Sequence, residues 1–341
     1  MLRTNRGIIE IAIALVIAFG VTMLGSGDAF AQELKIAHFM SPKHPMDVRM
    51  MRPWAAEVEK LSNGSLKVRI YPGGELGKGP REQFKRAVDG IADITFGLQG
   101  YTSKQFPRTT LIELPSVAAD AIDATKKMWN VFDNHLAVEY QRVKLLALWT
   151  NDGPVLMSKD KPIRKIDDLK GLKVRVPSKD QADLIAILGA TPVSMPASEM
   201  YRSLSTGVVD ALLVPATVIT SFKIGEVAKY YSTGLKFGRS PFFLAMNKTS
   251  YEGLSSEHRA IVDKTTGASL SLVGAKAYEE QGAEELERVR KSAKHEVIDL
   301  PADEVKRGNA LLIKAREQIV AGLEKEGVPA KAILAAMGAA N

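Results

Sequence analysis

LKGLKVRVPSKDQADLIAILGATPVSMPASEMYRSLSTGVVDALLVP, residues Leu169–Pro215, is the stretch that decides the fold class of this chain. Near its start, apolar and basic residues alternate over Leu172–Val176, which predicts a β-strand with one buried face. Pro177 ends the strand, and Lys179–Leu188 follows as an amphipathic helix. Because further strand and helix patterns follow in the same order, the stretch predicts part of an α/β fold.

Arg175 is the residue of this stretch that is best placed to bind a ligand. It lies at the carboxyl end of the predicted strand, and a helix N-terminus capped by Ser178 follows closely. In open α/β sheets, ligands bind at the carboxyl ends of the strands. A guanidinium group beside free helix amides suits a carboxylate or a phosphate. The alternative interpretation is an ordinary surface arginine on a half-exposed strand.

The length and composition favour a two-domain protein that handles anions. With 341 residues, the chain can form two domains and a sizeable core. Cysteine is absent, which excludes disulfides, thiolate metal sites and cysteine nucleophiles. The net charge is +7, but basic and acidic residues are interleaved, as in Glu279–Lys294, so we predict no nucleic-acid partner. A mildly positive field instead attracts anionic solutes.

Residues 1–31 have the pattern of a secretory signal peptide. A basic start and a short apolar centre, Ile11–Leu24, precede the small-x-small site Ala29–Ala31. We therefore predict cleavage after Ala31 and a periplasmic location. The alternative is an uncleaved membrane anchor, against which Glu10 and the cleavage site argue.

Strand and helix patterns alternate along the rest of the chain. The predicted strands are Glu33–Phe39, Leu66–Tyr71, Ala92–Phe96, Lys144–Trp149, Lys173–Val176, Thr191–Ser194, Ala211–Val214 and Phe242–Met246. The predicted helices outside the opening stretch are Met46–Leu61, Arg81–Val88, Ala119–Tyr140, Ser255–Lys294 and Ala302–Lys325. Strands that alternate with helices in this way predict parallel sheets.

Two breaks in this pattern predict that the chain crosses between two lobes. They lie at Asn151–Pro154 and at Gly238–Pro241. The predicted domain I contains residues 32–152 and 241–280, and the predicted domain II contains residues 153–240 and 281–341. Two crossings imply a hinge between the lobes rather than independent domains.

The opening stretch also resembles a known family. LKGLKVRVPS followed by GATPVSMPASEMYRSLSTGVVD is similar to the signature of the solute-binding proteins of tripartite ATP-independent periplasmic (TRAP) transporters, the DctP family. The resemblance continues through Trp54–Gly77 and Ala92–Pro115. It implies a periplasmic-binding-protein clamshell with two open sheets, helices on both faces, hinge strands and a long helix that spans both lobes. The resemblance further implies that Arg175 holds the carboxylate of an organic acid.

The same resemblance implies a ligand and protein partners. Its partners would be a small carboxylate ligand and the small and large integral-membrane subunits of a TRAP transporter. A monomer is expected, although an exposed face of Ser255–Lys294 can also pair with a copy of itself. We expect no cofactor and no metal.

Departures from the family pattern indicate the class of ligand. Val214 replaces an asparagine that bonds the ligand in many members, and Pro154 replaces a second arginine of members that bind sugar acids. Phe39 and Leu98 replace polar residues at strand ends, and Ala197 replaces a phenylalanine. A sugar acid would leave its hydroxyls unpaired here, at about 1–3 kcal/mol each. A dicarboxylate would lack a second cation, so the changes favour an aromatic or other apolar monocarboxylate.

Aromatic and amide side chains near the expected cleft extend this hypothesis. Rings can stack on an aromatic ligand, and amides or a tyrosine can bond a ring hydroxyl, although each side chain can instead belong to the core. The predicted ligand contacts are Arg175, Trp149, Phe39, Gln99, Tyr101, Asn151, Ala197, Val214 and Phe243. A phenyl or hydroxyphenyl carboxylate is the predicted ligand. Branched 2-oxo or 2-hydroxy acids and C4-dicarboxylates are the alternatives.

Patterns typical of enzymes are missing. The five histidines show no metal-binding spacing, and His38, near the expected cleft, has either a structural or a ligand-contact role. After the signal peptide no Gly-x-Ser-x-Gly occurs, and no Gly-x-Gly-x-x-Gly follows a strand. We therefore predict a binding protein and no enzyme. The open alternatives are a receptor of the ABC or sensory type and a periplasmic enzyme acting on an organic acid.

Overall fold

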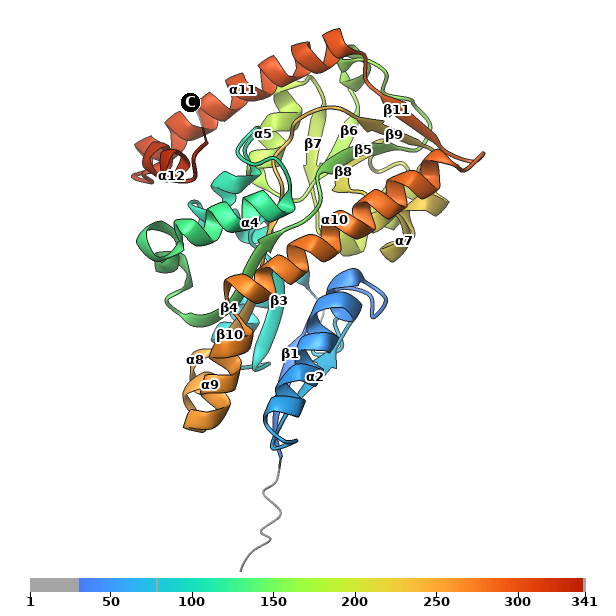
Figure 1. Cartoon of the computed structure of the whole chain (residues 1–341). Helices are drawn as coiled ribbons and strands as arrows, with labels where there is room; N and C mark the ends of the chain where they lie inside the picture. The colour runs from blue at the N-terminus through green and yellow to red at the C-terminus, as the bar shows by residue number, and fades with distance from the viewer. Residues whose placement is uncertain (1–30, 78, 340–341) are drawn as a thin grey trace, which may run out of the picture.

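The computed structural model of the protein describes residues 31–77 and 79–339 (Figure 1). All of the predicted signal peptide except Ala31 lies outside the described residues. Two open β-sheets form the two halves of the molecule, and helices pack on both faces of the sheets. This is the α/β, two-lobed architecture that the sequence predicts.

The first sheet has the strand order β2-β1-β3-β10-β4. Its strands are β1 (Gln32–Ala37), β2 (Leu66–Tyr71), β3 (Ile94–Leu98), β4 (Val143–Thr150) and β10 (Pro241–Asn247). Strand β1 pairs in parallel with β2 and β3, whereas β10 is antiparallel to β3 and β4. The helices of this half are α2 (Arg52–Leu61), α3 (Gln83–Val88), α4 (Ala121–Asn130), α8 (Lys248–Glu252) and α9 (Ser256–Thr265).

The second sheet has the strand order β11-β9-β5-β8-β6-β7. Its strands are β5 (Pro154–Ser158), β6 (Lys173–Val176), β7 (Thr191–Ser194), β8 (Ala211–Pro215), β9 (Tyr230–Thr233) and β11 (Glu296–Asp299). Strand β6 lies between β7 and β8 and is parallel to both. The remaining helices are α5 (Lys179–Ile187), α6 (Met200–Ser205), α7 (Val218–Ser221), α10 (Ala268–Arg290), α11 (Ala302–Lys325) and α12 (Ala330–Ala336).

Short turns of 3₁₀- or π-helix connect several of these elements. The π-helical turns are Met46–Met51 and Phe132–Leu136. The 3₁₀ turns are Pro80–Glu82, Gln99–Gln105, Thr109–Glu113, Ala137–Tyr140, Ile166–Leu169, Ala197–Glu199 and Ile224–Glu226. The turns Gln99–Gln105 and Ala197–Glu199 matter for function, because they follow β3 and β7 at the carboxyl ends of these strands.

The chain changes sheets three times, twice where the sequence has its breaks and once through α10. It passes from β4 to β5 between Thr150 and Pro154, and it returns from β9 to β10 between Thr233 and Pro241. Helix α10 contacts α4 and β4 of the first half and β11 of the second, and it runs obliquely across the molecule in Figure 1. The exact domain boundaries remain a prediction.

Two of the predicted helices are interrupted. The pattern over Ser255–Lys294 forms two helices, α9 and α10, because Gly267 between them has φ +78°, a conformation that favours glycine. The pattern over Ala119–Tyr140 is α-helical only to Asn130. At Val131 the backbone leaves the helical region, with φ −107° and ψ 2°, and short turns follow.

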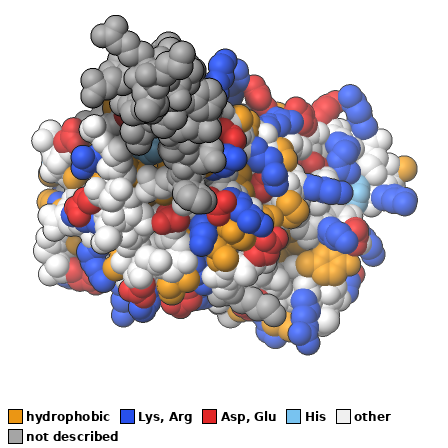
Figure 2. All heavy atoms as spheres, turned by 90° about the horizontal axis from the view of Figure 1, so that it is seen from below, with side chains coloured by type: hydrophobic (Ala, Val, Ile, Leu, Met, Phe, Trp, Pro, Cys, Tyr) orange, Lys and Arg blue, Asp and Glu red, His pale blue; other side chains and the backbone are white. Residues whose placement is uncertain are grey.

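The surface carries both signs of charge. Figure 2 shows Lys and Arg side chains interspersed with Asp and Glu side chains over the described part of one face. Many of these charges form short-range ion pairs, such as Lys179 with Asp183 at 2.9 Å along α5. Such exposed pairs contribute little to the free energy of unfolding. None of the helices within residues 31–77 and 79–339 has the length and apolar character that a membrane span requires.

Candidate functional site

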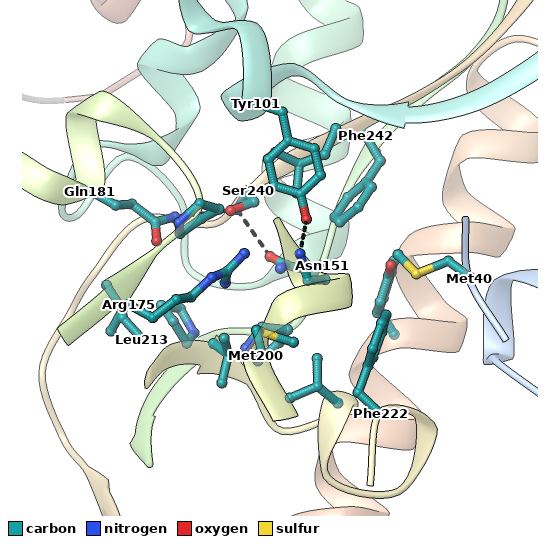
Figure 3. Close-up of a pocket in the computed structure, with 18 of the residues that line it drawn as sticks. Met40, Tyr101, Asn151, Arg175, Gln181, Met200, Leu213, Phe222, Ser240 and Phe242 are labelled. Carbon is teal, nitrogen blue, oxygen red and sulfur yellow. Dashed lines mark hydrogen bonds between the residues drawn. The ribbon is translucent and has the colours of Figure 1, made fainter. Parts of the chain in front are cut away.

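A pocket between the two halves is the candidate site (Figure 3). Its empty volume, which includes open solvent, is about 510 Å³. Side chains from the first sheet, from the second sheet, from both crossings and from α10 line it. Any ligand held here therefore contacts both halves at once.

Arg175 supplies the positive charge of the pocket. Strand β6 carries it into the interior, where 3% of the residue is exposed, and α5 begins directly afterwards at the Ser178 N-cap. Its Nε donates to the Met195 carbonyl oxygen at 2.9 Å, which orients the guanidinium group. Among the described residues, no carboxylate forms an ion pair with Arg175. Burial lowers the pKa of Arg175, so an anionic ligand would compensate a cation that is costly to bury.

Tyr101 connects the two halves beside this cation. Its hydroxyl accepts a hydrogen bond from the Ala197 backbone N–H at 2.8 Å, and the positive charge of the nearby Arg175 acts on it. Burial raises the pKa of Tyr101, so the hydroxyl keeps its proton. Because this oxygen already accepts from Ala197, its O–H remains to donate to a ligand.

Asn151 and Ser240 bind the two crossing segments together. The Asn151 N–H donates to the Ser240 carbonyl oxygen at 3.2 Å, and the Ser240 N–H donates to Asn151 Oδ1 at 3.0 Å. Gln181 Nε2, from α5, donates to Ser240 Oγ at 2.9 Å. Within the described part of the chain, Asn151 Nδ2 has no acceptor. This amide is therefore a second donor for a ligand near Arg175.

Most of the remaining lining is apolar. Phe242 is its central ring, and it stacks on Phe96 with ring centroids 5.3 Å apart. All four positions where the sequence departs from the family pattern inside the pocket contribute apolar groups, namely Leu98, Pro154, Ala197 and Val214. Arg175 is the only permanently charged residue in the described lining. The pocket can therefore pair one carboxylate and otherwise favours apolar ligand surface.

His44 and Tyr278 form the other end of the pocket. The two rings meet edge to face with centroids 5.7 Å apart, and the His44 ring lies 6.1 Å from that of Phe222. Burial lowers the pKa of His44 to about 3, so the imidazole is neutral at ordinary pH. The Tyr278 hydroxyl is buried without a hydrogen-bond partner among the described residues.

Five of the nine predicted contact residues line the pocket. They are Tyr101, Asn151, Arg175, Ala197 and Val214. The other four are packed in the core around it, and the contacts of each explain why.

The strand register separates Phe243 from the pocket. In β10, Phe242 is opposite Trp149 and Phe243 is opposite Leu148, so the two neighbouring rings face opposite sides of the sheet. The Phe243 ring lies over Gly97 and meets Phe84 at 5.6 Å. Phe242 therefore takes the place in the pocket that the sequence analysis assigned to Phe243.

The remaining three side chains lie behind the lining. Trp149 is fully buried and stacks on Phe242 at 6.1 Å. Phe39 packs against Phe96 and Tyr101 rather than reaching the pocket. Gln99 Nε2 donates to the Tyr140 hydroxyl at 2.8 Å, so this amide is used in the core. These three residues support the pocket wall instead of forming it.

Sequence reasoning missed several lining residues. Examples are His44, Gln181, Ser240, Phe242 and Tyr278. For Tyr278 a signal exists, because Gly274, Tyr278 and Gly282 recur every four residues on one face of α10. Small residues at this spacing allow a helix to approach the crossing closely. His44 has no comparable signal, since it lies between two prolines in a connecting segment.

Two buried carboxyl groups lie close to the crossings. Asp152 accepts a hydrogen bond from the Thr217 backbone N–H at 3.3 Å, and burial raises the pKa of Asp152 to about 7. Glu113 accepts from the Ser178 hydroxyl, and burial, with Asp180 nearby, raises the pKa of Glu113 to about 8. In the part of the chain that the structure describes, no cluster of three or more His, Cys, Asp or Glu residues could hold a metal ion.

Comparisons with known proteins agree with this geometry. The family model described as bacterial extracellular solute-binding protein, family 7, matches residues 36–320. A TRAP solute-binding protein from Rhodoferax ferrireducens T118, solved in complex with copurified benzoate, is 28% identical with a TM-score of 0.85, and the match covers 89% of this chain and 96% of that chain.

Two further proteins show the range of similarity. A marine metagenome TRAP solute-binding protein specific for aromatic acid ligands, solved with 3-hydroxybenzoate, is 27% identical with a TM-score of 0.86, covering 89% of this chain and 96% of that chain. The C4-dicarboxylate-binding periplasmic protein DctP of Rhodobacter capsulatus is 26% identical over 93% of this chain and 96% of that protein. The family model covers most of the sequence, so this chain belongs to the DctP family of TRAP transporter solute-binding proteins.

Proposed function

We propose that this protein captures an aromatic or other apolar monocarboxylate in the periplasm and delivers it to the small and large membrane subunits of a TRAP transporter. Export would use the signal peptide, with cleavage after Ala31. The observation that carries the proposal is Arg175, a buried guanidinium with no carboxylate partner among the described residues. It lies in a pocket whose other walls are mostly apolar.

Three donors can receive the ligand carboxylate at one end of the pocket. The Arg175 guanidinium provides charge and a planar fork, and the Tyr101 hydroxyl and the Asn151 amide provide neutral donors. They come from β6 of the second sheet, from the turn after β3 of the first sheet and from a crossing, respectively. A carboxylate that contacts all three would hold the two lobes together, which is how ligand binding would favour the closed form.

The apolar walls favour an aromatic ring beyond the carboxylate. Phe242 and Phe222 present rings to the pocket, and Val214 and Leu213 present aliphatic groups. Ring stacking adds roughly 0.5–1.5 kcal/mol per aromatic pair beyond the burial of apolar surface. The two solved relatives named above contain benzoate and 3-hydroxybenzoate, which supports the same ligand class.

A C4-dicarboxylate is the second candidate, because the Rhodobacter capsulatus relative is named for one. Its second carboxylate would need another cation or several donors. The only other basic residue in the described lining is His44, and the pKa of His44, about 3, keeps it neutral. Pro154 and Val214 provide no donor either. A dicarboxylate would therefore bury one charge without compensation.

A thermal-shift screen of the secreted protein against carboxylates tests the proposal. At about 100 times the dissociation constant, binding adds about 2.7 kcal/mol, a Tm shift of about 4 °C for a mature chain of about 310 residues. We expect benzoate and phenylacetate to raise the Tm, and succinate and glucuronate to leave it unchanged. Shifts with succinate alone would overturn the aromatic assignment and favour the second candidate. Chemical conversion of a bound acid would overturn the assignment as a binding protein.

A further inference from the structure

We propose that the end of the pocket opposite Arg175 is a polar subsite for a hydroxyl group on the ligand ring, formed by His44 and Tyr278. The ligand class is then a hydroxylated aryl monocarboxylate rather than an unsubstituted one. This inference rests on the proposed function, because it assumes that a carboxylate occupies Arg175.

The two polar ends of the pocket are well separated. In Figure 3, Arg175 lies on one side of the space, and Phe222 and Met40 lie on the other. The His44 ring is 6.1 Å from Phe222, which places His44 at the Phe222 end, and Tyr278 lies between His44 at 5.7 Å and Phe242 at 5.4 Å. A rigid ligand that spans this distance presents its carboxylate at one end and a ring substituent at the other.

His44 is a neutral hydrogen-bond donor. Its Nδ1 accepts from the Met46 backbone N–H at 3.2 Å, so the proton of the neutral ring is on Nε2. Burial, reinforced by His38, lowers the pKa of His44 to about 3 and prevents a second protonation. Within the described residues, Nε2 has no acceptor, although only 1% of the residue is exposed. An uncharged acceptor on the ligand would complete this hydrogen bond.

Tyr278 provides a second polar atom that lacks a partner. The residue is 1% exposed, and its hydroxyl forms no hydrogen bond with the described residues. The ring is held by stacking on Phe242, with centroids 5.4 Å apart at an interplanar angle of 29°. A buried hydroxyl without a partner is unfavourable, and a ligand group that bonds it removes this penalty.

A phenolic hydroxyl matches both atoms. Its oxygen can accept from His44 Nε2–H, and it can donate to or accept from the Tyr278 hydroxyl. A second carboxylate fits less well, since neither residue carries a charge to balance it. A purely apolar ring would leave both atoms unsatisfied. The chemistry of this end therefore selects a neutral oxygen.

The test compares acids that differ by one hydroxyl. Calorimetric titrations of the secreted protein would use benzoate with 3- and 4-hydroxybenzoate, and phenylacetate with 3- and 4-hydroxyphenylacetate. We expect the best hydroxylated acid of a pair to bind about tenfold more tightly than the parent acid. Tyr278→Phe and His44→Phe should each remove most of this preference. His44→Gln, which keeps an N–H donor, should restore part of it.

Two readouts separate this role from a merely structural one. Tyr278→Phe should weaken binding of the hydroxylated acid more than binding of the unsubstituted acid, and it should raise the Tm of the ligand-free protein because it removes an unsatisfied hydroxyl. Tyr201→Phe, at an exposed tyrosine away from the pocket, is the matched control and should change neither quantity.

Failure of the inference differs from failure of the proposed function. If the wild type binds both acids of each pair equally, or if the preference survives both Tyr278→Phe and His44→Phe, the subsite is refuted while the aromatic-acid function stands. If no aromatic acid of either kind binds, the proposed function fails and the subsite fails with it. Tight binding of a dicarboxylate that requires His44 would refute the neutral-oxygen assignment.

Discussion

The two ends of the pocket differ in how they present polar groups to a ligand. At one end, Arg175 places a full charge in the interior, and its Nε is held by the backbone carbonyl of Met195, directly after β7. At the other end, His44 and Tyr278 present neutral polar atoms that lack protein partners among the described residues. A buried charge demands an opposite charge, whereas a buried hydroxyl or imidazole accepts any neutral partner of suitable shape. If the proposed function holds, the first end sets the ligand class and the second sets selectivity within that class.

The largest effect should come from removing the charged end. Arg175→Ala should weaken binding of benzoate by at least two orders of magnitude, since loss of one partner of a buried ion pair costs about 3–5 kcal/mol. Titration calorimetry measures this directly. Lys173→Ala, two residues earlier on β6 and exposed, is the control and should bind normally. Unchanged affinity in Arg175→Ala would show that the carboxylate lies elsewhere.

The pH dependence of stability should also originate near the charged end. Glu113, which bonds the Ser178 cap beside Arg175, has a pKa raised from 4.5 to about 8 by burial, so the folded state binds a proton that the unfolded state releases. Stability is therefore greatest below pH 4.5 as far as this group is concerned, and it falls as the pH rises from 4.5 to 8. The loss is about 4–5 kcal/mol across this window.

Glu113→Gln tests this assignment. The variant keeps the shape of the side chain but cannot ionise, so its Tm should fall less between pH 5 and pH 8.5 than that of the wild type. Asp152, with a pKa raised to about 7 by burial, should cause part of the slope that remains. Calorimetric melting curves at several pH values provide the measurement. Parallel curves for wild type and variant would rule out Glu113 as the source.

A smaller effect should follow from disturbing the helix that carries the neutral end. A Cβ at Gly282 would lie 2.2 Å from Asp152 Oδ2, so Gly282→Ala should push α10 away from the crossing and lower the stability by about 1–3 kcal/mol. At Gly322 in α11 a Cβ would meet nothing within 4 Å, so Gly322→Ala should stabilise the helix by about 0.5–1 kcal/mol. Chemical denaturation of the two variants compares them. Equal changes of the same sign would contradict the close approach of α10.

The smallest effect on binding should come from replacing Phe242, and it should distinguish this ring from the adjacent ring of Phe243. Phe242→Leu should weaken binding of aromatic acids about fivefold, equivalent to about 1 kcal/mol, because it removes a stacking partner from the pocket. Phe243→Leu should leave affinity unchanged and lower the Tm, because its ring fills the core over Gly97. Calorimetric affinity and melting temperature together separate the roles. A binding defect in Phe243→Leu but not in Phe242→Leu would contradict the placement of Phe242 in the pocket and of Phe243 in the core.

Local patterns in the sequence predicted most of the fold and the charged end of the site. Alternation over Lys173–Val176, a proline and a serine cap place Arg175 at the carboxyl end of a strand before a helix, and the structure agrees. The two crossings were visible because Gly and Pro interrupt the periodicity there. Pro154 and Val214 indicated an apolar lining only through the resemblance to the family, whose pattern has an arginine and an asparagine at these positions. The inferences about strands, caps and crossings depend on neighbours within a few positions of the chain.

The neutral end was decided by tertiary structure alone. Phe242 and Phe243 are equally apolar, and only the register of β10 against β3 and β4 determines which of them faces the pocket. His44 and Tyr278 are more than two hundred residues apart in sequence, and they meet because α10 crosses both halves. Sequence periodicity reports which face of an element is buried, because that depends on the element itself. It does not report which distant element covers that face, because that depends on how all the others pack.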